Sequence, residues 1–176
     1  MIENLSNSDI LLAQHVKRWH MIRMQDKQSV AEHSFNVAML TIKMLRDLDK
    51  EGSYGITAEE QLSVMEWALC HDIHEIEHGD VPSPSGVDRG DTEDVFWNKR
   101  RREVGPSFEA RNFVCLMDKV EAYIYFHHHG FDGKRNGKYI SDYLRDRVEQ
   151  SLSQFSAPIQ DYVHELIDDA TELYCD

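Results

Sequence analysis

Cysteine, long apolar runs and secretory features are all scarce in this sequence. Its three cysteines, Cys70, Cys115 and Cys175, are odd in number and far apart, which excludes a disulfide framework or a cysteine-based zinc motif. No apolar run approaches the roughly 18 residues that span a bilayer, and the N-terminus lacks the basic start and apolar stretch of a secretory signal. We therefore expect reduced thiols, a cytoplasmic location and no membrane partner.

Positive charge is also scarce. The 19 lysines and arginines are outnumbered by 32 aspartates and glutamates, which gives a formal net charge of -13. A protein that binds DNA or RNA normally carries a basic face, so a nucleic acid polymer is excluded as a partner. A small anionic substrate needs only a local basic pocket, often with a metal ion, and is compatible with this composition.

Strand patterns are essentially absent, and apolar residues recur with helical spacing along most of the chain. Two capping boxes mark helix starts, Ser29 with Glu32 and Thr57 with Glu60. The length of 176 residues fits one domain over 1–176, and we predict an all-α fold. The expected helices cover 7–20, 30–50, 58–77, 92–105, 106–129, 139–155 and 158–174.

Two loops interrupt this helical pattern. Residues 79–91 contain three glycines and two prolines, and a loop of this length in a compact domain is usually functional. Residues 130–138 form the second expected loop. The histidine run at 127–129, just before it, is interpreted as cationic side chains that favour a helix C-terminus.

Three of the expected helices place a polar, metal-competent residue in an apolar stripe. His33 lies in the stripe of the 30–50 helix, and His71 and Glu75 continue the stripe of the 58–77 helix. Asp118 lies in the stripe of the 106–129 helix, which also includes Cys115. Because a buried carboxylate needs a cation, a hydrogen-bond donor or a metal, we expect these groups to meet.

Together with Asp72, these residues make a ligand set of two imidazoles and two carboxylates. The set His33, His71, Asp72 and Asp118 suits Zn, Co or Mn. A single histidine on an apolar face is more often a core residue, and a His-Asp pair alone is weak evidence. The combination with a Gly-Asp-x-Pro loop after the second element favours a metal site.

The order of these motifs resembles the HD-domain phosphohydrolases, which carry a histidine, then a His-Asp pair, then a distant aspartate, all on helices. The resemblance is stronger to the bacterial HD-domain 5′-deoxynucleotidases, over about residues 10–125. In its compact size the chain also resembles the phage dATP triphosphohydrolases. The motifs here read Arg18-Trp19, Glu32-His33, His71-Asp72-Ile73-His74-Glu75 and Gly79-Asp80-Val81-Pro82.

This resemblance implies an HD-domain helical bundle that hydrolyses a phosphoester with a divalent metal. Glu75, one helical turn after His71, would act as general acid or base. Asp80 would orient the water, protonate the leaving oxygen or bind the sugar 3′-hydroxyl, and Arg18 would hold phosphate oxygens. Further expected substrate contacts are Trp19, Ile22 and Pro82 for the base and sugar, and Arg89, Lys119 and residues 99–102 for a triphosphate, with a second Mg²⁺.

The predicted reaction is hydrolysis of dATP to deoxyadenosine and triphosphate, in the host cytoplasm if the chain is phage-encoded. The alternative is a 5′-deoxynucleotidase that acts on deoxynucleoside monophosphates. A di-iron HD oxygenase using His74 and His78, or a non-catalytic nucleotide sensor, is also open. The expected partner is a small deoxynucleotide, and the expected assembly is a homo-oligomer, either a dimer or a hexamer.

Overall fold

A computed structural model describes residues 5–52, 54–80, 96, 108–131 and 135–172. Over these ranges the secondary structure is helical, apart from isolated bridges at Lys17–Ser29 and Met24–Gly130, and no strand is formed. The predicted all-α fold is therefore confirmed. Among these helices none combines the length and the apolar character needed to cross a membrane.

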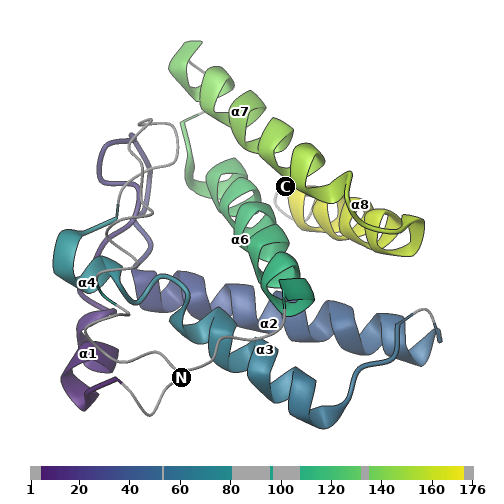
Figure 1. Cartoon of the computed structure of the whole chain (residues 1–176). Coiled ribbons are helices and arrows are strands. Elements are labelled where there is room, and N and C mark those ends of the chain that lie inside the picture. Colours follow the sequence, from purple (N-terminus) through teal and green to yellow (C-terminus); the bar gives the residue numbers. More distant parts are fainter. Residues whose placement is uncertain (1–4, 53, 81–95, 97–107, 132–134, 173–176) are drawn as a thin grey trace.

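The core is built where three long helices meet. Helix α2 (Val30–Lys50) packs against both α3 (Ala58–Cys70) and α6 (Phe108–His129), and α6 also packs against α3. Helices α7 (Arg135–Leu152) and α8 (Ala157–Glu172) both pack on α6, away from α3 (Figure 1). All five helices contribute buried apolar side chains to one cluster, so the central position of α6 ties the bundle together.

Side-chain caps determine where α2 and α3 begin. The Ser29 hydroxyl accepts from the Glu32 amide, while the Glu32 carboxylate accepts from the Ser29 amide. Thr57 and Glu60 make the same reciprocal pair at the start of α3. The predicted helix over 30–50 is confirmed, because the cap supplies partners for the first free amides and an apolar face buries the helix.

The predicted helix over 58–77 is interrupted after Cys70. Residues 71–74 form tight turns with backbone bonds between residues three apart, such as Ile73 N–H to Cys70 O at 3.1 Å. The chain then forms the short helix α4 (Glu75–His78). Successive side chains in a helix point about 100° apart, yet the ligand atoms of His71 and Asp72 both reach the same centre.

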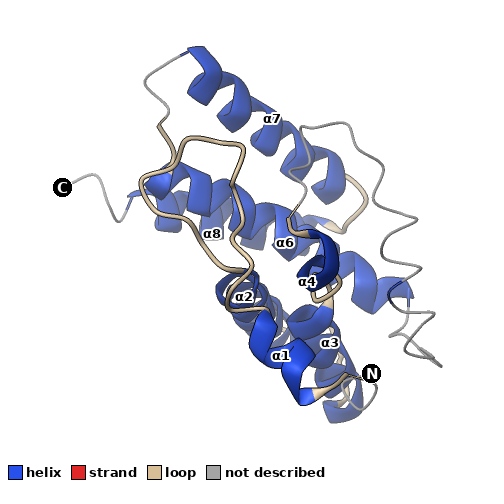
Figure 2. Cartoon of the chain, turned by 90° about the vertical axis from the view of Figure 1, so that its left-hand side faces the viewer, coloured by secondary structure: helices blue, strands red, loops and turns tan. Residues whose placement is uncertain are grey.

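The predicted helix over 7–20 is wrong in its second half. Helix α1 (Asn7–Leu12) ends early, and residues 13–28 cross the ends of α2 and α6 in an irregular path (Figure 2). Trp19 adopts a φ of 64°, which no α-helix accommodates. The carboxylate of Asp80 accepts the Trp19 amide at 3.0 Å, so a tertiary bond replaces the helical one.

The remaining helix boundaries differ by a few residues from those expected. Helix α7 begins at Arg135, inside the predicted 130–138 loop, and ends at Leu152. Helix α8 covers Ala157–Glu172, close to the predicted 158–174. Most of the predicted 79–91 loop and of the 92–105 helix lies outside the described residues. Of the latter, Phe96 is helical and fully buried.

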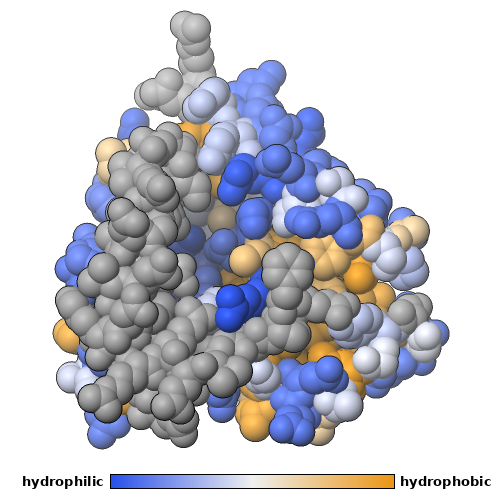
Figure 3. Space-filling view, viewed as in Figure 1, coloured by the Kyte–Doolittle hydropathy of each residue, from blue (hydrophilic) through white to orange (hydrophobic). Residues whose placement is uncertain are grey.

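The buried faces follow the predicted stripes with one exception. Val30, Val37 and Met44 form the buried apolar stripe of α2 around His33, but Cys115 on α6 is exposed and lies outside the core. The stripe of α6 is carried by other residues, such as Val114. On the outside, hydrophilic residues dominate over α7, whereas hydrophobic ones gather between α8 and α2 (Figure 3).

Cys70 and Cys115 should therefore react with thiol reagents at very different rates. Burial, assisted by the charge of Glu66, raises the pKa of the Cys70 thiol to about 11, so little reactive thiolate forms. In a Cys175→Ser variant, one thiol should react with an aromatic disulfide reagent in the native state. Mass spectrometry should place the label on Cys115, and native labelling of Cys70 would contradict the packing.

Candidate metal centre

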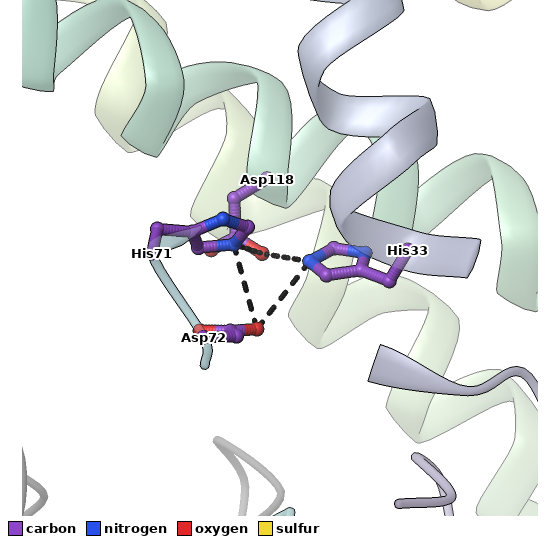
Figure 4. A group of neighbouring side chains, drawn as sticks. All are labelled: His33, His71, Asp72 and Asp118. Carbon is purple, nitrogen blue, oxygen red and sulfur yellow. Dashed lines mark ion pairs between the residues drawn. The ribbon is translucent and has the colours of Figure 1, made fainter. Parts of the chain in front are cut away.

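Four side chains from three parts of the chain converge on one point. His33 comes from α2, His71 and Asp72 from the turn after α3, and Asp118 from α6 (Figure 4). Their ligand atoms all lie within 4.8 Å of one another. The His33 Nε2 is 3.1 Å from Asp118 Oδ1 and 3.5 Å from Asp72 Oδ2. The structure thus brings together the four predicted ligands.

Both imidazoles are oriented by a hydrogen bond on the far side of the ring. The Nδ1–H of His33 donates to Glu121 at 2.6 Å, and the Nδ1–H of His71 donates to the Ala68 carbonyl at 2.7 Å. This leaves both Nε2 atoms buried and facing the centre, where the carboxylates of Asp72 and Asp118 are their polar neighbours. Two such nitrogens beside two carboxylates fit a divalent metal.

The charges at this centre depend strongly on one another. Burial opposes the charged form of Asp118, but the hydrogen bond and charge of His33 hold its pKa far below the ordinary value. Burial also opposes the charge on His33, yet the carboxylates of Glu121 and Asp118 raise its pKa to about 8. The metal-free centre therefore keeps its carboxylates ionised and holds a proton on His33 at neutral pH.

Glu121 is a site residue that the sequence analysis missed. Its carboxylate is buried and bonds the His33 ring, and it also lies 3.7 Å from Arg18. The available signal was its position on α6, three residues after Asp118, which places both side chains on one helix face. That signal is weak, because glutamate is common on exposed helix faces.

Arg18 lies beside the four ligands, as the motif predicts. Its guanidinium is buried and is 3.9 Å from Asp118. Burial opposes its charge, but the carboxylates of Asp72, Asp118 and Glu121 raise the pKa of Arg18. Its Nε and Nη1 groups have no hydrogen-bond partner among the described residues. Buried, charged and unsatisfied donors of this kind are suited to an anionic group such as phosphate.

Trp19 and Asp80 form the neighbouring wall. The Trp19 ring is buried and stacks on Tyr125 with ring centres 6.3 Å apart, and Ile22 packs in the same cluster. Asp80 is buried, and its carboxylate accepts the Trp19 amide. A hydrogen bond therefore joins the Arg18-Trp19 motif directly to the Gly79-Asp80 motif.

The other predicted site residues lie outside the four-ligand group or outside the described residues. Glu75 is buried at the start of α4 and near enough to Arg18 to affect its charge. Lys119 follows Asp118, but its ammonium donates to the Cys115 carbonyl on its own helix at 2.6 Å. Pro82, Arg89 and residues 99–102 lie outside the described residues.

Two further histidines stay apart from the metal-ligand group. His74 is buried and bonds the His71 carbonyl at 3.2 Å, while His78 lies near Glu77 at the end of α4. Within the part of the chain that the structure describes, the metal-competent group consists of the four predicted ligands alone. This gives no support to the di-iron alternative, which needs additional histidine ligands.

The fold and motifs resemble those of the HD-domain phosphohydrolases. Residues 10–94 match the family model described as 5′-deoxynucleotidase YfbR-like. The backbone is similar to that of the cyanophage S-2L HD phosphohydrolase DatZ, with a TM-score of 0.76 and 20% identity, over 96% of this chain and 97% of DatZ. The DatZ structure is bound to dA and one catalytic Zn²⁺ ion. The predicted resemblance to this family is thereby confirmed.

At the level of individual proteins, the chain is similar to phage dATP triphosphohydrolases. The enzyme of Salmonella phage PMBT28 is 28% identical over 155 residues, which cover 83% of this chain and 77% of the relative. The enzyme of Acinetobacter phage SH-Ab 15497 is 36% identical over 91 residues, covering 47% of this chain and 42% of that relative. The likeness to the first relative therefore includes the segments that carry the four ligands.

Divalent metal binding should weaken as the pH falls through about 8. Since the pKa of His33 is raised to about 8, a proton occupies the ring below that pH and must leave before Nε2 can bind a metal. One displaced proton corresponds to about a tenfold loss of affinity per pH unit. Competition of Zn²⁺ between the protein and a chelator of known affinity, at several pH values, measures this slope.

An Asp72→Ala variant provides the control for site-specific binding. It should lose most Zn²⁺ affinity at every pH, because it removes one of the four predicted ligands. A wild-type affinity that does not change between about pH 6 and pH 8 would contradict the proton competition.

Proposed function

We propose that this chain is a metal-dependent phosphohydrolase that cleaves dATP to deoxyadenosine and triphosphate. The observation that carries the proposal is the buried Arg18 guanidinium, with unsatisfied donors, directly beside the four-ligand group. A phosphate held by Arg18 would lie next to that group. The similarity to phage dATP triphosphohydrolases and to the dA-bound DatZ supports a deoxynucleotide as the substrate that carries this phosphate.

His33, His71, Asp72 and Asp118 would hold the metal, with Zn²⁺ as the first choice and Co²⁺ or Mn²⁺ as alternatives. A divalent ion bound there supplies a Lewis acid and lowers the pKa of a bound water toward ~7. Zn²⁺ is favoured by the mixed nitrogen and oxygen ligands, and it is the catalytic ion of the DatZ structure. A second Mg²⁺ would accompany the triphosphate.

The protein groups have distinct tasks in the proposed reaction. Arg18 binds oxygens of the α-phosphate and offsets the charge that develops on them. The attacking water forms a bond to the α-phosphorus, and the bond between that phosphorus and the 5′-oxygen breaks. Glu75 is proposed as the group that takes the proton of the water, and Asp80 as the group that orients the water, protonates the 5′-oxygen or binds the 3′-hydroxyl.

Trp19 is proposed as the wall of the base pocket, together with Ile22 and Pro82. The Trp19 ring stacks on Tyr125, and the Trp19 backbone amide donates a hydrogen bond to the Asp80 carboxylate. These two contacts make the wall rigid. An apolar wall against the purine 2-position rejects an added amino group by steric clash and desolvation. Arg89 and Lys119 are proposed contacts for the remaining phosphates.

A second candidate function is a 5′-deoxynucleotidase that acts on deoxynucleoside monophosphates. The match of residues 10–94 to a 5′-deoxynucleotidase model favours it, and both activities would use Arg18 and the metal in the same way. Both reactions release the deoxynucleoside, and they differ only in whether the second product is phosphate or triphosphate.

We also propose that residues 1–176 form one domain that works in the cytoplasm as a homo-oligomer, either a dimer or a hexamer. The shared core of α2, α3, α6, α7 and α8 supports the single domain. Exposed apolar residues on the outer face of α2, Phe35 and Met39, support self-association.

Replacing Glu75 by glutamine should abolish most turnover without removing the metal. The amide cannot accept a proton, and general acid–base groups contribute about 10²–10⁴-fold to rate. Turnover under saturating dATP and the metal content of the purified variant are the two measurements. Glu59→Gln on exposed α3 surface is the matched control, and an unchanged rate in Glu75→Gln would remove this residue from the mechanism.

The substrate is tested by comparing dATP, dGTP, 2-amino-dATP and dAMP at equal concentration. We expect release of deoxyadenosine and triphosphate from dATP, and slow reaction with the two nucleotides that carry a 2-amino group. Chromatography of the nucleoside and phosphate products distinguishes the outcomes. Equal cleavage of dGTP would contradict the apolar wall, and cleavage of dAMP alone would establish the monophosphatase alternative.

A further inference from the structure

The carboxylate of Glu121 is shared between the metal centre and the Arg18 segment. Its Oε2 accepts the Nδ1–H of His33 at 2.6 Å. Its Oε1 accepts the side-chain amides of Gln28 at 2.5 Å and Asn36 at 3.0 Å. Glu121 itself is only 4% exposed, so these protein groups, rather than water, satisfy it.

On the metal side, Glu121 determines which ring nitrogen of His33 carries the proton. Accepting from Nδ1 fixes the proton on that nitrogen and leaves the Nε2 lone pair for a metal. A negatively charged acceptor also makes the imidazole a better electron donor. His71 has no such charged acceptor, because its Nδ1–H donates to the neutral carbonyl of Ala68.

On the substrate side, Glu121 holds the segment that carries Arg18. The Gln28 side chain donates to Glu121, while the Gln28 carbonyl accepts the Arg18 amide at 2.8 Å. The Arg18 Nη1 is also 3.7 Å from Glu121 Oε2. One carboxylate therefore fixes both a metal ligand and the backbone of the phosphate-binding arginine.

The surroundings of Glu121 require a side chain that only accepts hydrogen bonds. His33, Gln28 and Asn36 all approach it as donors. Glutamine has the same shape, but its NH₂ group would face a donor on one side or the other. A side chain chosen only to fill space would not need this property.

We propose that Glu121 is a positioning residue that sets His33 and Arg18 at a fixed separation, so that a metal-bound group and a bound phosphate meet in reacting geometry. This inference rests on the proposed function, because it assumes that the four-ligand group binds a metal and that Arg18 binds phosphate. It assigns Glu121 no contact with the substrate and no proton transfer.

A simpler role would be to offset the buried charge of Arg18. In that case the loss of the carboxylate charge would lower the stability of the metal-free protein and leave metal affinity and metal geometry unchanged. The two roles are therefore separated by measurements on the metal, made without any substrate.

The first test compares Glu121→Gln with the wild type and with Glu165→Gln, an exposed glutamate on α8. We expect Glu121→Gln to weaken Zn²⁺ binding by about 10–100-fold, the usual effect of losing an outer partner of a ligand histidine. The visible spectrum of the Co²⁺-loaded variant should shift as well. Glu165→Gln should match the wild type in both, and the melting temperature of each metal-free protein reports its folding.

The second test uses Gln28→Ala, which removes only the link toward Arg18. This variant should raise the KM for dATP while its Zn²⁺ affinity stays at the wild-type value. In the double variant with Glu121→Gln, the loss in kcat/KM should be smaller than the two single losses combined, because both act on one network.

The outcomes separate this inference from the proposed function. Wild-type protein that neither binds Zn²⁺ nor cleaves a deoxynucleotide would overturn the proposed function. Wild-type binding and cleavage, with unchanged Zn²⁺ affinity and Co²⁺ spectrum in Glu121→Gln, would overturn the inference alone. Fully additive losses in the double variant would overturn the link between the metal side and the Arg18 side.

Discussion

The structure depends on the concentration of negative charge around one guanidinium. Asp72, Glu75 and Glu121 are buried, Asp118 is partly buried, and Arg18 is the arginine that lies among them. Even with a proton on His33, four carboxylates outnumber the two cations, and this excess of negative charge in a region of low dielectric constant is unfavourable without compensation. A divalent ion in the four-ligand group would offset this excess, so metal binding and folding should be thermodynamically linked.

Two local departures from regular structure make this concentration possible. The chain leaves the α-helix in tight turns at residues 71–74, and the side chains of His71 and Asp72 both reach the centre from this segment. The left-handed conformation of Trp19 turns the chain so that Arg18 enters the bundle while the indole lies on Tyr125. The Trp19 conformation is maintained by a hydrogen bond to the distant Asp80, as irregular backbone at functional sites usually is.

The sequence predicts the regular part of this molecule well because its signals are local. Capping boxes and apolar spacing identify where α2 and α3 begin, and polar residues within apolar stripes identify His33 and Asp118. The left-handed turn at Trp19 depends on a tertiary hydrogen bond to Asp80, 61 residues away. No local pattern encodes that bond. Glu121 was missed for the same reason, because its partners come from separate segments.

The four predicted ligands differ in exposure, so solvent reaches the centre mainly from one side. The side chain of His33 is fully buried and those of His71 and Asp72 are 11% exposed, whereas that of Asp118 is 34% exposed. A metal ion would therefore approach past Asp118, and a phosphate on Arg18, whose guanidinium is 3.9 Å from Asp118, would share that approach. On a shared path the ion has to enter first, and a nucleotide seated on Arg18 then stands between the ion and the solvent. The enzyme would hold its metal most tightly while it is occupied with substrate.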